Sequence, residues 1–99
     1  MRNSVLIILI FISIGAYANQ ADSLFVKANK LYQNEKYSEA LDLYKEIEKH
    51  NISSDDLLYN MANTYYKMNK VAASIYYYEK VLQQSPNHAD AKFNLSFAK

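Results

Sequence analysis

The stretch that decides the fold is "DDLLYNMANTYYKMNKVAASIYYYEKVLQQSPN", residues 55–87. Apolar and small side chains recur in it at steps of three and four residues, the spacing of one face of an α-helix. This spacing predicts a helix over 55–68 and a second helix over 71–84, which Pro86 ends. No alternation of apolar and polar residues competes, so an all-α fold is expected. The residues that set the two stripes are Leu58, Met61, Ala62 and Tyr65, then Ser74, Ile75, Tyr78, Val81 and Leu82.

The same spacing continues on both sides of this stretch, so that the chain from residue 21 onward is expected to be helical with short turns. Two start signals support the helix boundaries. Ser53 with Asp56 three residues later has the pattern of an N-cap followed by an acid in the first turn, and Asn87 with Asp90 repeats it. The further predicted helices cover residues 22–34, 38–50 and 89–99.

An internal repeat appears when the sequence is shifted by 34 residues against itself. Tyr44 falls on Tyr78, and Ala28 falls on Ala62. Size class is preserved together with polarity, which chance rarely produces. The other matches are Asp22, Asp56 and Asp90; Phe25, Tyr59 and Phe93; Tyr32 and Tyr66; Leu41 and Ile75; Ile47 and Val81.

A helix-turn-helix period of 34 residues is the signature of the tetratricopeptide repeat, and the sequence resembles that family over residues 21–99. The resemblance implies an all-α, right-handed helical-hairpin solenoid with two full repeats and the first helix of a third. Ile52 stands where the family has proline, and the turn positions Glu35 and Asn69 lack the common glycine. Asn69 tolerates a left-handed backbone, and Asn34 is expected to adopt it beside Glu35. The implied units are repeat 1 at 21–54, repeat 2 at 55–88 and a partial third repeat at 89–99.

Three consecutive tyrosines, Tyr76 to Tyr78, have different expected roles because successive helical residues point about 100° apart. Tyr78 shares its face with Ser74 and Val81, so it is expected in the core. Tyr77 is expected to brace the neighbouring unit. Tyr76 is expected on the outer, solvent-facing side, exposed and without a catalytic role.

Composition excludes most kinds of chemical site. With 0 cysteines there is no disulfide, thiolate ligand or thiol nucleophile, and the 1 glycine, Gly15, leaves no phosphate-binding loop. His50 and His88 lie far apart at turns, so we expect solvated turn histidines and not a metal site. The net charge of +1 gives no nucleic-acid footprint. We therefore predict that the protein is not an enzyme and has no catalytic, metal or cofactor-binding residues.

The first 18 residues have the order of a secretory signal peptide. Arg2 precedes an apolar run over residues 5–14, and small residues follow, ending in Ala16-Tyr17-Ala18. As a helix the apolar run spans roughly 15 Å, against a hydrocarbon core of about 30 Å. We expect cleavage after Ala18 and an exported protein, periplasmic or membrane-associated. An uncleaved membrane anchor is the alternative.

A second stripe of side chains runs beside the core stripe on the first helix of each unit. In the tetratricopeptide family this stripe lines the concave groove where extended peptides or partner helices lie, so the resemblance implies a protein-binding groove. Tyrosine and asparagine suit this task, because they combine rigid apolar area with amides that pair with a peptide backbone. Use in packing alone is the alternative. The implied groove residues are Phe25, Asn29, Tyr32, Tyr59, Asn63, Tyr66 and Phe93.

The chain as a whole also resembles the N-terminal part of BatE-type proteins, which are tetratricopeptide components of the bacterial aerotolerance operon. The stretch "SPNHADAKFNLSFAK", residues 85–99, carries this resemblance best. It implies a cell-envelope location and a scaffolding part in a membrane-associated complex. Such proteins continue into further segments, so a fragment or a shortened relative is expected. A structural or assembly segment of a larger membrane-associated protein or homo-oligomer, with no groove ligand, is the alternative.

Two repeats and one further helix fall short of the three repeats that a robust solenoid usually needs. Leu95 and Ala98 on the last helix are therefore expected to be poorly covered. From this we expect a chain of marginal stability or one that self-associates.

Overall fold

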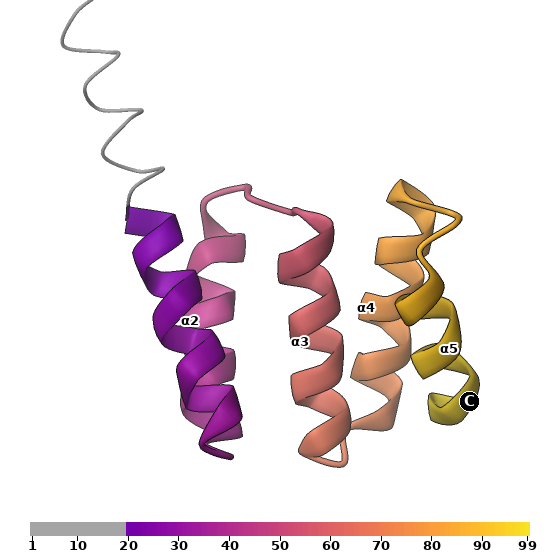
Figure 1. Cartoon of the computed structure of the whole chain (residues 1–99), viewed down its shortest axis with the longest axis horizontal. Helices are drawn as coiled ribbons and strands as arrows, with labels where there is room; N and C mark the ends of the chain where they lie inside the picture. Colours follow the sequence, from indigo (N-terminus) through magenta and orange to yellow (C-terminus); the bar gives the residue numbers. More distant parts are fainter. Residues whose placement is uncertain (1–19) are drawn as a thin grey trace, which may run out of the picture.

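The computed structural model describes residues 20–99, which form helices joined by short turns (Figure 1). No strand occurs in this part of the chain, which confirms the predicted all-α fold. The proposed signal peptide lies outside the described residues. The helix bounds lie within about two residues of the expected ones. They are the first helix over residues 20–33, α2 Tyr37–Lys49, α3 Asp55–Lys67, α4 Val71–Gln84 and α5 Ala89–Ala98.

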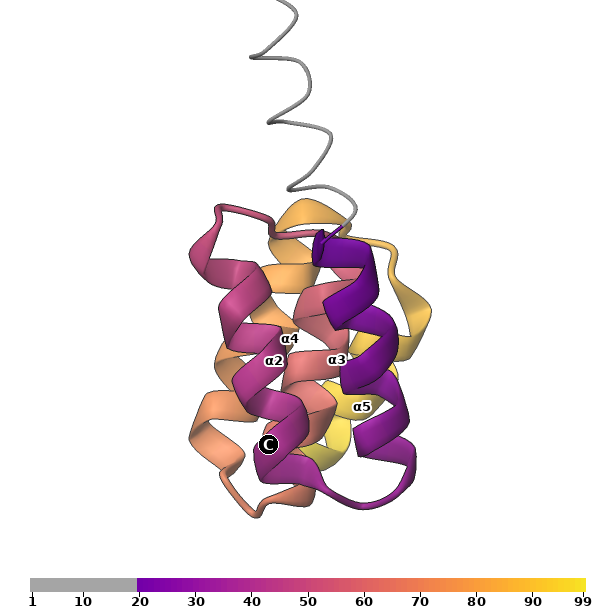
Figure 2. The same cartoon turned by 90° about the vertical axis from the view of Figure 1, so that its left-hand side faces the viewer.

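The helices form two layers. Figures 1 and 2 show the first helix, α3 and α5 side by side in one layer, with α2 and α4 in the other. Along the chain, α3 packs against both α2 and α4, and α4 packs against α5. This is a solenoid of helical hairpins, as predicted. We call the surface formed by the first helix, α3 and α5 the inner wall.

The core consists of two clusters, each centred on one buried tyrosine. Tyr44 and Tyr78 are both only 1% exposed. Around Tyr44 lie residues of the first hairpin together with Leu57 and Met61 from α3. Around Tyr78 lie residues of the second hairpin together with Leu95 from α5. Each cluster therefore joins one hairpin to the first helix of the next unit, and burial of each aromatic ring contributes about 1.5–3 kcal/mol.

The three consecutive tyrosines of α4 take the three predicted positions. Tyr78 is in the core, whereas Tyr76 is 57% exposed. Tyr77 stacks on Tyr65 with 5.4 Å between ring centroids, and its hydroxyl donates to Glu48 Oε1 of α2 at 3.0 Å. Tyr77 thus braces the neighbouring hairpin, as expected.

The predicted helix caps are each wrong by one residue. Ser54, not Ser53, caps α3, because its Oγ accepts from the Leu57 N–H at 3.2 Å. His88, not Asn87, caps α5, and its Nδ1 accepts from the Ala91 N–H at 3.1 Å. An imidazole nitrogen can take the role of a cap oxygen because in its neutral form it is an acceptor.

Three turn residues have a left-handed backbone. Asn69 has φ 64°, as predicted, and Asn51 has φ 61°. In the first inter-helix turn Glu35 itself has φ 62°, so the expectation for Asn34 is wrong. Glu35 N–H donates to the Tyr32 carbonyl at 2.9 Å, just as Asn69 N–H donates to the Tyr66 carbonyl at 3.0 Å. The two turns therefore have the same hydrogen-bonded geometry. The first turn adopts it despite the steric cost of a left-handed glutamate, about 1–2 kcal/mol.

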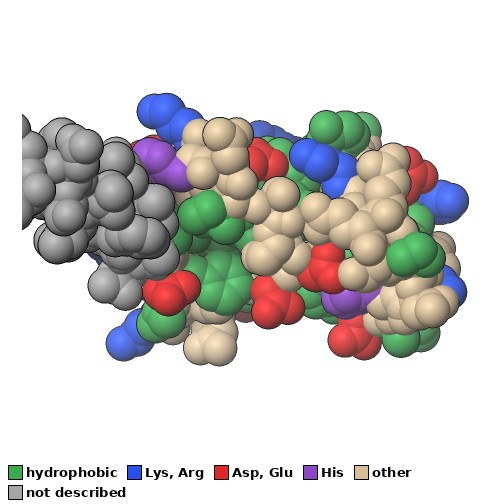
Figure 3. Space-filling model, turned by 90° about the horizontal axis from the view of Figure 1, so that it is seen from above, with side chains coloured by type: hydrophobic (Ala, Val, Ile, Leu, Met, Phe, Trp, Pro, Cys, Tyr) green, Lys and Arg blue, Asp and Glu red, His purple; other side chains and the backbone are tan. Residues whose placement is uncertain are grey.

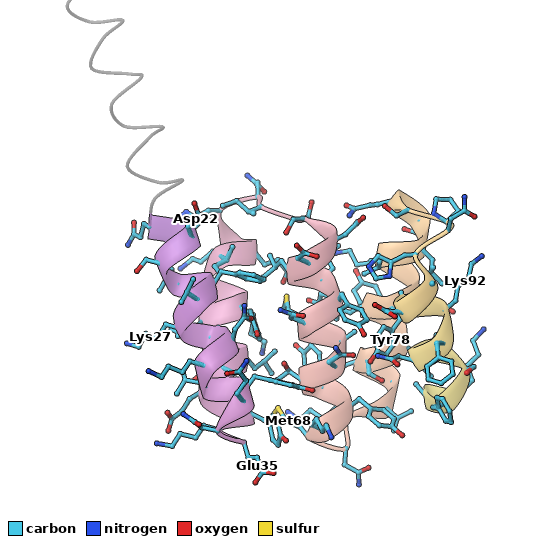
Figure 4. All side chains as sticks on the ribbon, viewed as in Figure 1. Asp22, Lys27, Glu35, Met68, Tyr78 and Lys92 are labelled. Carbon is cyan, nitrogen blue, oxygen red and sulfur yellow. The ribbon has the colours of Figure 1, made fainter. Side chains whose placement is uncertain are left out.

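Polar residues cover both ends of the stack. Leu95 and Ala98 are buried against α4, so the expectation that they are poorly covered is wrong. The outer face of α5 instead carries exposed Lys92 and Ser96, where α3 has buried Leu58 and Ala62. On the first helix, exposed Ser23, Lys27 and Lys30 stand where α3 has buried Leu57, Met61 and Thr64. Figure 4 shows Lys27 and Lys92 pointing away from opposite ends. Polar outer faces are what end units of a solenoid need for solubility.

Candidate protein-binding groove

A hydrogen-bonded trio joins the first hairpin to α3. The Oδ1 atom of Asn29, on the first helix, accepts from the Tyr44 hydroxyl of α2 at 2.5 Å and from Asn60 Nδ2 of α3 at 2.9 Å. Both lone pairs of this oxygen are therefore used. The bonds fix the distance between neighbouring helices of the inner wall.

The same trio recurs one repeat later. The Tyr78 hydroxyl of α4 donates to Asn63 Oδ1 of α3. Asn94 Nδ2 of α5 donates to the same Asn63 oxygen at 3.0 Å and to the Tyr59 hydroxyl at 2.9 Å. We call the two trios together the asparagine ladder; its members are Asn29, Tyr44 and Asn60, then Asn63, Tyr78 and Asn94.

The asparagine ladder leaves part of each amide unused. Among the described residues, the Nδ2 atoms of Asn29 and Asn63 and the Oδ1 atoms of Asn60 and Asn94 have no hydrogen-bond partner. No buried side-chain nitrogen or oxygen of the described chain lacks a partner, so these four atoms are accessible to solvent. The inner wall therefore presents amide donors and acceptors at the repeat spacing.

Two adjoining pockets follow the asparagine ladder along the inner wall, and Tyr32 and Asn63 belong to both. The first, about 280 Å³, is lined by Asn29, Tyr32, Gln33, Tyr44, Asn60 and Asn63. The second, about 250 Å³, is lined by Asn63, Tyr66, Lys67, Tyr78, Asn94 and Phe97, together with Tyr32. We call them the first and second subsite. Adding 34 to each number of the first subsite gives the six named members of the second.

Comparison with known proteins agrees with this geometry. Residues 56–88 match the family model described as Tetratricopeptide repeat. The crystal structure of the Sgt2 TPR domain from Aspergillus fumigatus superposes with a TM-score of 0.74 and 23% sequence identity, covering 80% of this chain. The fold is that of a tetratricopeptide-repeat domain. This chain spans 52% of that longer chain, and the comparison with curated proteins finds no match.

Burial keeps the two core tyrosines of the tetratricopeptide fold neutral. Removal from water raises the pKa of Tyr44 and of Tyr78 to about 12, from an ordinary value of 10.0. At physiological pH their hydroxyls therefore keep the protons that they donate to the asparagine oxygens. Since Oδ1 accepts these bonds, Nδ2 remains as the outward group of Asn29 and Asn63.

The seven groove residues implied by the tetratricopeptide resemblance fall into different environments. The rings of Phe25 and Tyr59 are half-buried, each with 6.1 Å between its centroid and that of the core tyrosine below it, Tyr44 or Tyr78. Asn29 and Asn63 belong to the asparagine ladder. Tyr32 lines both subsites, and Tyr66, 42% exposed, lines the second. Phe93 lines neither subsite; its ring packs edge-on against Phe97 with 5.0 Å between centroids.

Seven residues of the subsites were not among the implied groove residues: Gln33, Tyr44, Asn60, Lys67, Tyr78, Asn94 and Phe97. The signal that could have found them is the 34-residue shift, which places Gln33 on Lys67 and Asn60 on Asn94. The family stripe follows one line of side chains on the first helix of each unit, so most of these residues lie off it. A groove between two helices also takes residues from the facing edge of the next helix.

The described residues offer little else for chemistry. Over residues 20–99 no group of three histidine, aspartate or glutamate side chains is placed to hold a metal ion. His50 Nε2 lies 3.7 Å from Glu46 Oε1, and His88 packs against Tyr59 with 5.2 Å between ring centroids. In the same range, no helix has the length and apolar character required to cross a bilayer.

Proposed function

We propose that the protein is an adaptor that binds an extended segment of another polypeptide along its inner wall. The observation that carries this proposal is the repeated subsite: two pockets of the same construction, side by side, each with an unused amide nitrogen and an aromatic wall. An extended polypeptide suits this inner wall, because its peptide groups recur at a fixed spacing, as the subsites do.

The contacts follow from the unused groups of the asparagine ladder. Asn29 and Asn63 Nδ2 would donate to ligand carbonyls, while Asn60 and Asn94 Oδ1 would accept from ligand N–H groups. Tyr66 supplies a rigid aromatic surface beside them, at low cost in side-chain entropy. Neighbouring helices lie about 8–10 Å apart, which an extended peptide covers in about three residues.

Photo-crosslinking in the producing cells tests the groove directly. A photoreactive phenylalanine analogue at Tyr66, on the inner wall, is expected to capture a discrete partner. The same analogue at Tyr76 is the control, because Tyr76 is also exposed but lies on α4 in the other layer. In a pull-down from the same cells without the photoreactive analogue, the double variant Tyr66→Ala/Phe97→Ala should lose that partner while keeping its unfolding midpoint. Identical adducts from both positions, or retention of the partner by the double variant, would contradict the proposal.

The proposal extends to an exported protein in a bacterial cell-envelope complex linked to aerotolerance. It is supported by the charged, apolar and small segments of residues 1–18 in signal-peptide order, and by the resemblance of residues 85–99 to BatE-type proteins. Mass spectrometry of the protein isolated from cells should give a mature N-terminus at Asn19. A mature chain that retains residues 1–18 in the cytosolic fraction would count against export.

A purely structural or assembly segment, without a groove ligand, is the second candidate. The observation that favours it is the internal use of the asparagine ladder, since Asn29 and Asn63 Oδ1 bind within the chain. Phe25 and Tyr59 likewise pack on Tyr44 and Tyr78. The crosslinking experiment separates the two candidates, because an assembly segment gives no adduct that depends on Tyr66 and Phe97.

A further inference from the structure

The two subsites differ at two of their six equivalent positions. Gln33 of the first subsite corresponds to Lys67 of the second, and Asn63 of the first corresponds to Phe97 of the second. The other four positions hold the same residue type in both: asparagine, tyrosine, tyrosine and asparagine. The inner wall therefore contains the same set of lining positions twice. The two sets differ in the residue at the edge, Gln33 or Lys67, and in the residue at the far side, Asn63 or Phe97.

Lys67 is the one charged residue that lines either subsite in the described chain. Its ammonium group has no ion-pair partner among residues 20–99. Gln33 and Lys67 lie in the last turns of the first helix and α3, so they share the edge of the inner wall where Figure 4 labels Glu35 and Met68. The second subsite thus carries a free positive charge at this edge, and the first does not.

Acidic residues lie at the opposite end of the same helices. Asp22, Asp56 and Asp90 stand in the first turns of the first helix, α3 and α5. Figure 3, which looks onto this end, shows acidic side chains at several points along it. A negatively charged ligand group on the inner wall is therefore drawn toward Lys67 and away from the aspartate end.

Aromatic rings complete the second subsite. Phe97 is 65% exposed and Tyr66 is 42% exposed, and both line this pocket. Phe93 packs against Phe97 and widens the exposed aromatic surface beyond the pocket. In the first subsite the amide of Asn63 stands at the position of Phe97, so the exposed phenylalanine ring is a feature of the second subsite alone.

From these differences we infer that the second subsite selects an acidic side chain next to an aromatic or large aliphatic one in the bound segment, with an uncharged polar residue about three positions away in the first subsite. This inference rests on the proposed function. The carboxylate belongs to a side chain rather than a chain end, because Lys67 lies at the edge of the inner wall, while the unused amides of Asn29, Asn60 and Asn94 are spread over all three of its helices.

The test uses fluorescein-labelled, N-acetylated and C-amidated peptides of serine, asparagine and glutamine with one central pair: Asp-Phe, Asn-Phe or Lys-Phe. Binding to the full chain is measured by fluorescence anisotropy at low salt. The Asp-Phe peptide should bind about two- to fivefold tighter than the Asn-Phe peptide, the range of an exposed ion pair. High salt should remove this preference.

Two variants exchange the chemistry of the subsites. Lys67→Gln installs the residue of the first subsite and should abolish the preference for Asp-Phe, while Lys67→Glu should reverse it in favour of Lys-Phe. The matched variant Gln33→Lys should create a second preference, for a peptide with aspartate about three positions from the aromatic pair. A free C-terminal carboxylate should add no affinity.

The outcomes separate this inference from the proposed function. If peptides bind but Asp-Phe and Asn-Phe have equal affinity, or if Lys67→Glu leaves the order of peptide affinities unchanged, the inference is overturned. The proposed peptide-binding groove still stands in that case. If only peptides with a free C-terminus bind, the side-chain assignment is overturned. If no peptide binds the full chain at all, the groove proposal and the inference both fail.

Discussion

The Tyr78 hydroxyl binds Asn63 Oδ1 in the same way that the Tyr44 hydroxyl binds Asn29 Oδ1, one repeat earlier in the chain. In both cases the tyrosine ring is buried in the core of its hairpin while its hydroxyl reaches the inner wall. The core and the groove therefore share residues. A side chain that stabilises the hairpin also fixes the orientation of the amide that faces a ligand.

Removal of either ladder hydroxyl is expected to destabilise the fold. Tyr44→Phe and Tyr78→Phe should each lower the free energy of unfolding by about 1 kcal/mol, the net contribution of one hydrogen bond. Asn29 and Asn63 keep their second donor, so neither oxygen is left without a partner. Urea unfolding followed by circular dichroism measures the effect. Tyr76→Phe is the control and should change stability by less than about 0.5 kcal/mol; equal losses for all three variants would contradict the role of the asparagine ladder.

Alkaline pH is expected to destabilise the protein, and the same two tyrosines contribute to this loss of stability. Burial raises the pKa of Tyr44 and Tyr78 to about 12, from 10.0, so the folded state holds these protons more tightly than the unfolded state. Their contribution is fully present below pH 10 and is lost as the pH rises from about 10 to 12. Unfolding free energies measured across this range should fall less steeply for Tyr44→Phe/Tyr78→Phe than for wild type. Parallel profiles would show that other groups govern alkaline unfolding.

The cap of α3 can be assigned by a pair of adjacent substitutions. Ser54→Ala removes the oxygen that accepts from the Leu57 N–H and should cost about 1 kcal/mol of stability. Ser53→Ala, one residue earlier, should be close to neutral because Ser53 is exposed and precedes the cap. Thermal unfolding of the two variants gives the comparison. A larger loss of stability for Ser53→Ala would show that Ser53 is the N-cap, as the sequence pattern predicts.

The polar ends of the stack make a prediction about association. Lys92→Leu/Ser96→Ala gives α5 the residues that α3 has at the equivalent positions, Leu58 and Ala62. The resulting apolar face should increase self-association relative to wild type, because exposed apolar area becomes buried when two copies associate. Sedimentation velocity at several protein concentrations measures this change. An unchanged sedimentation coefficient would show that these two side chains do not protect the end of the stack.

Much of the candidate groove was predictable, because residues 34 positions apart occupy equivalent places in successive repeats. Tyr32 and Tyr66 of the predicted stripe line the subsites. The direction of the amides was not predictable. The amides of Asn29 and Asn63 were expected to pair with a peptide backbone, but the oxygen of each accepts from a tyrosine hydroxyl of the partner helix. Sequence spacing does not tell which atom of an amide a distant hydroxyl will reach.

The sequence by itself determined the helices, their repeat and the burial of Tyr44 and Tyr78, because these depend on local periodicity and on the size of side chains one helical turn apart. Only the tertiary structure decided which faces meet. Leu95 and Ala98 were expected to lack cover, yet they are buried because α4 lies against that face of α5. Lys67 and Phe97 became members of one subsite for the same reason. Packing of neighbouring units, and not local pattern, sets the relative position of residues on different helices.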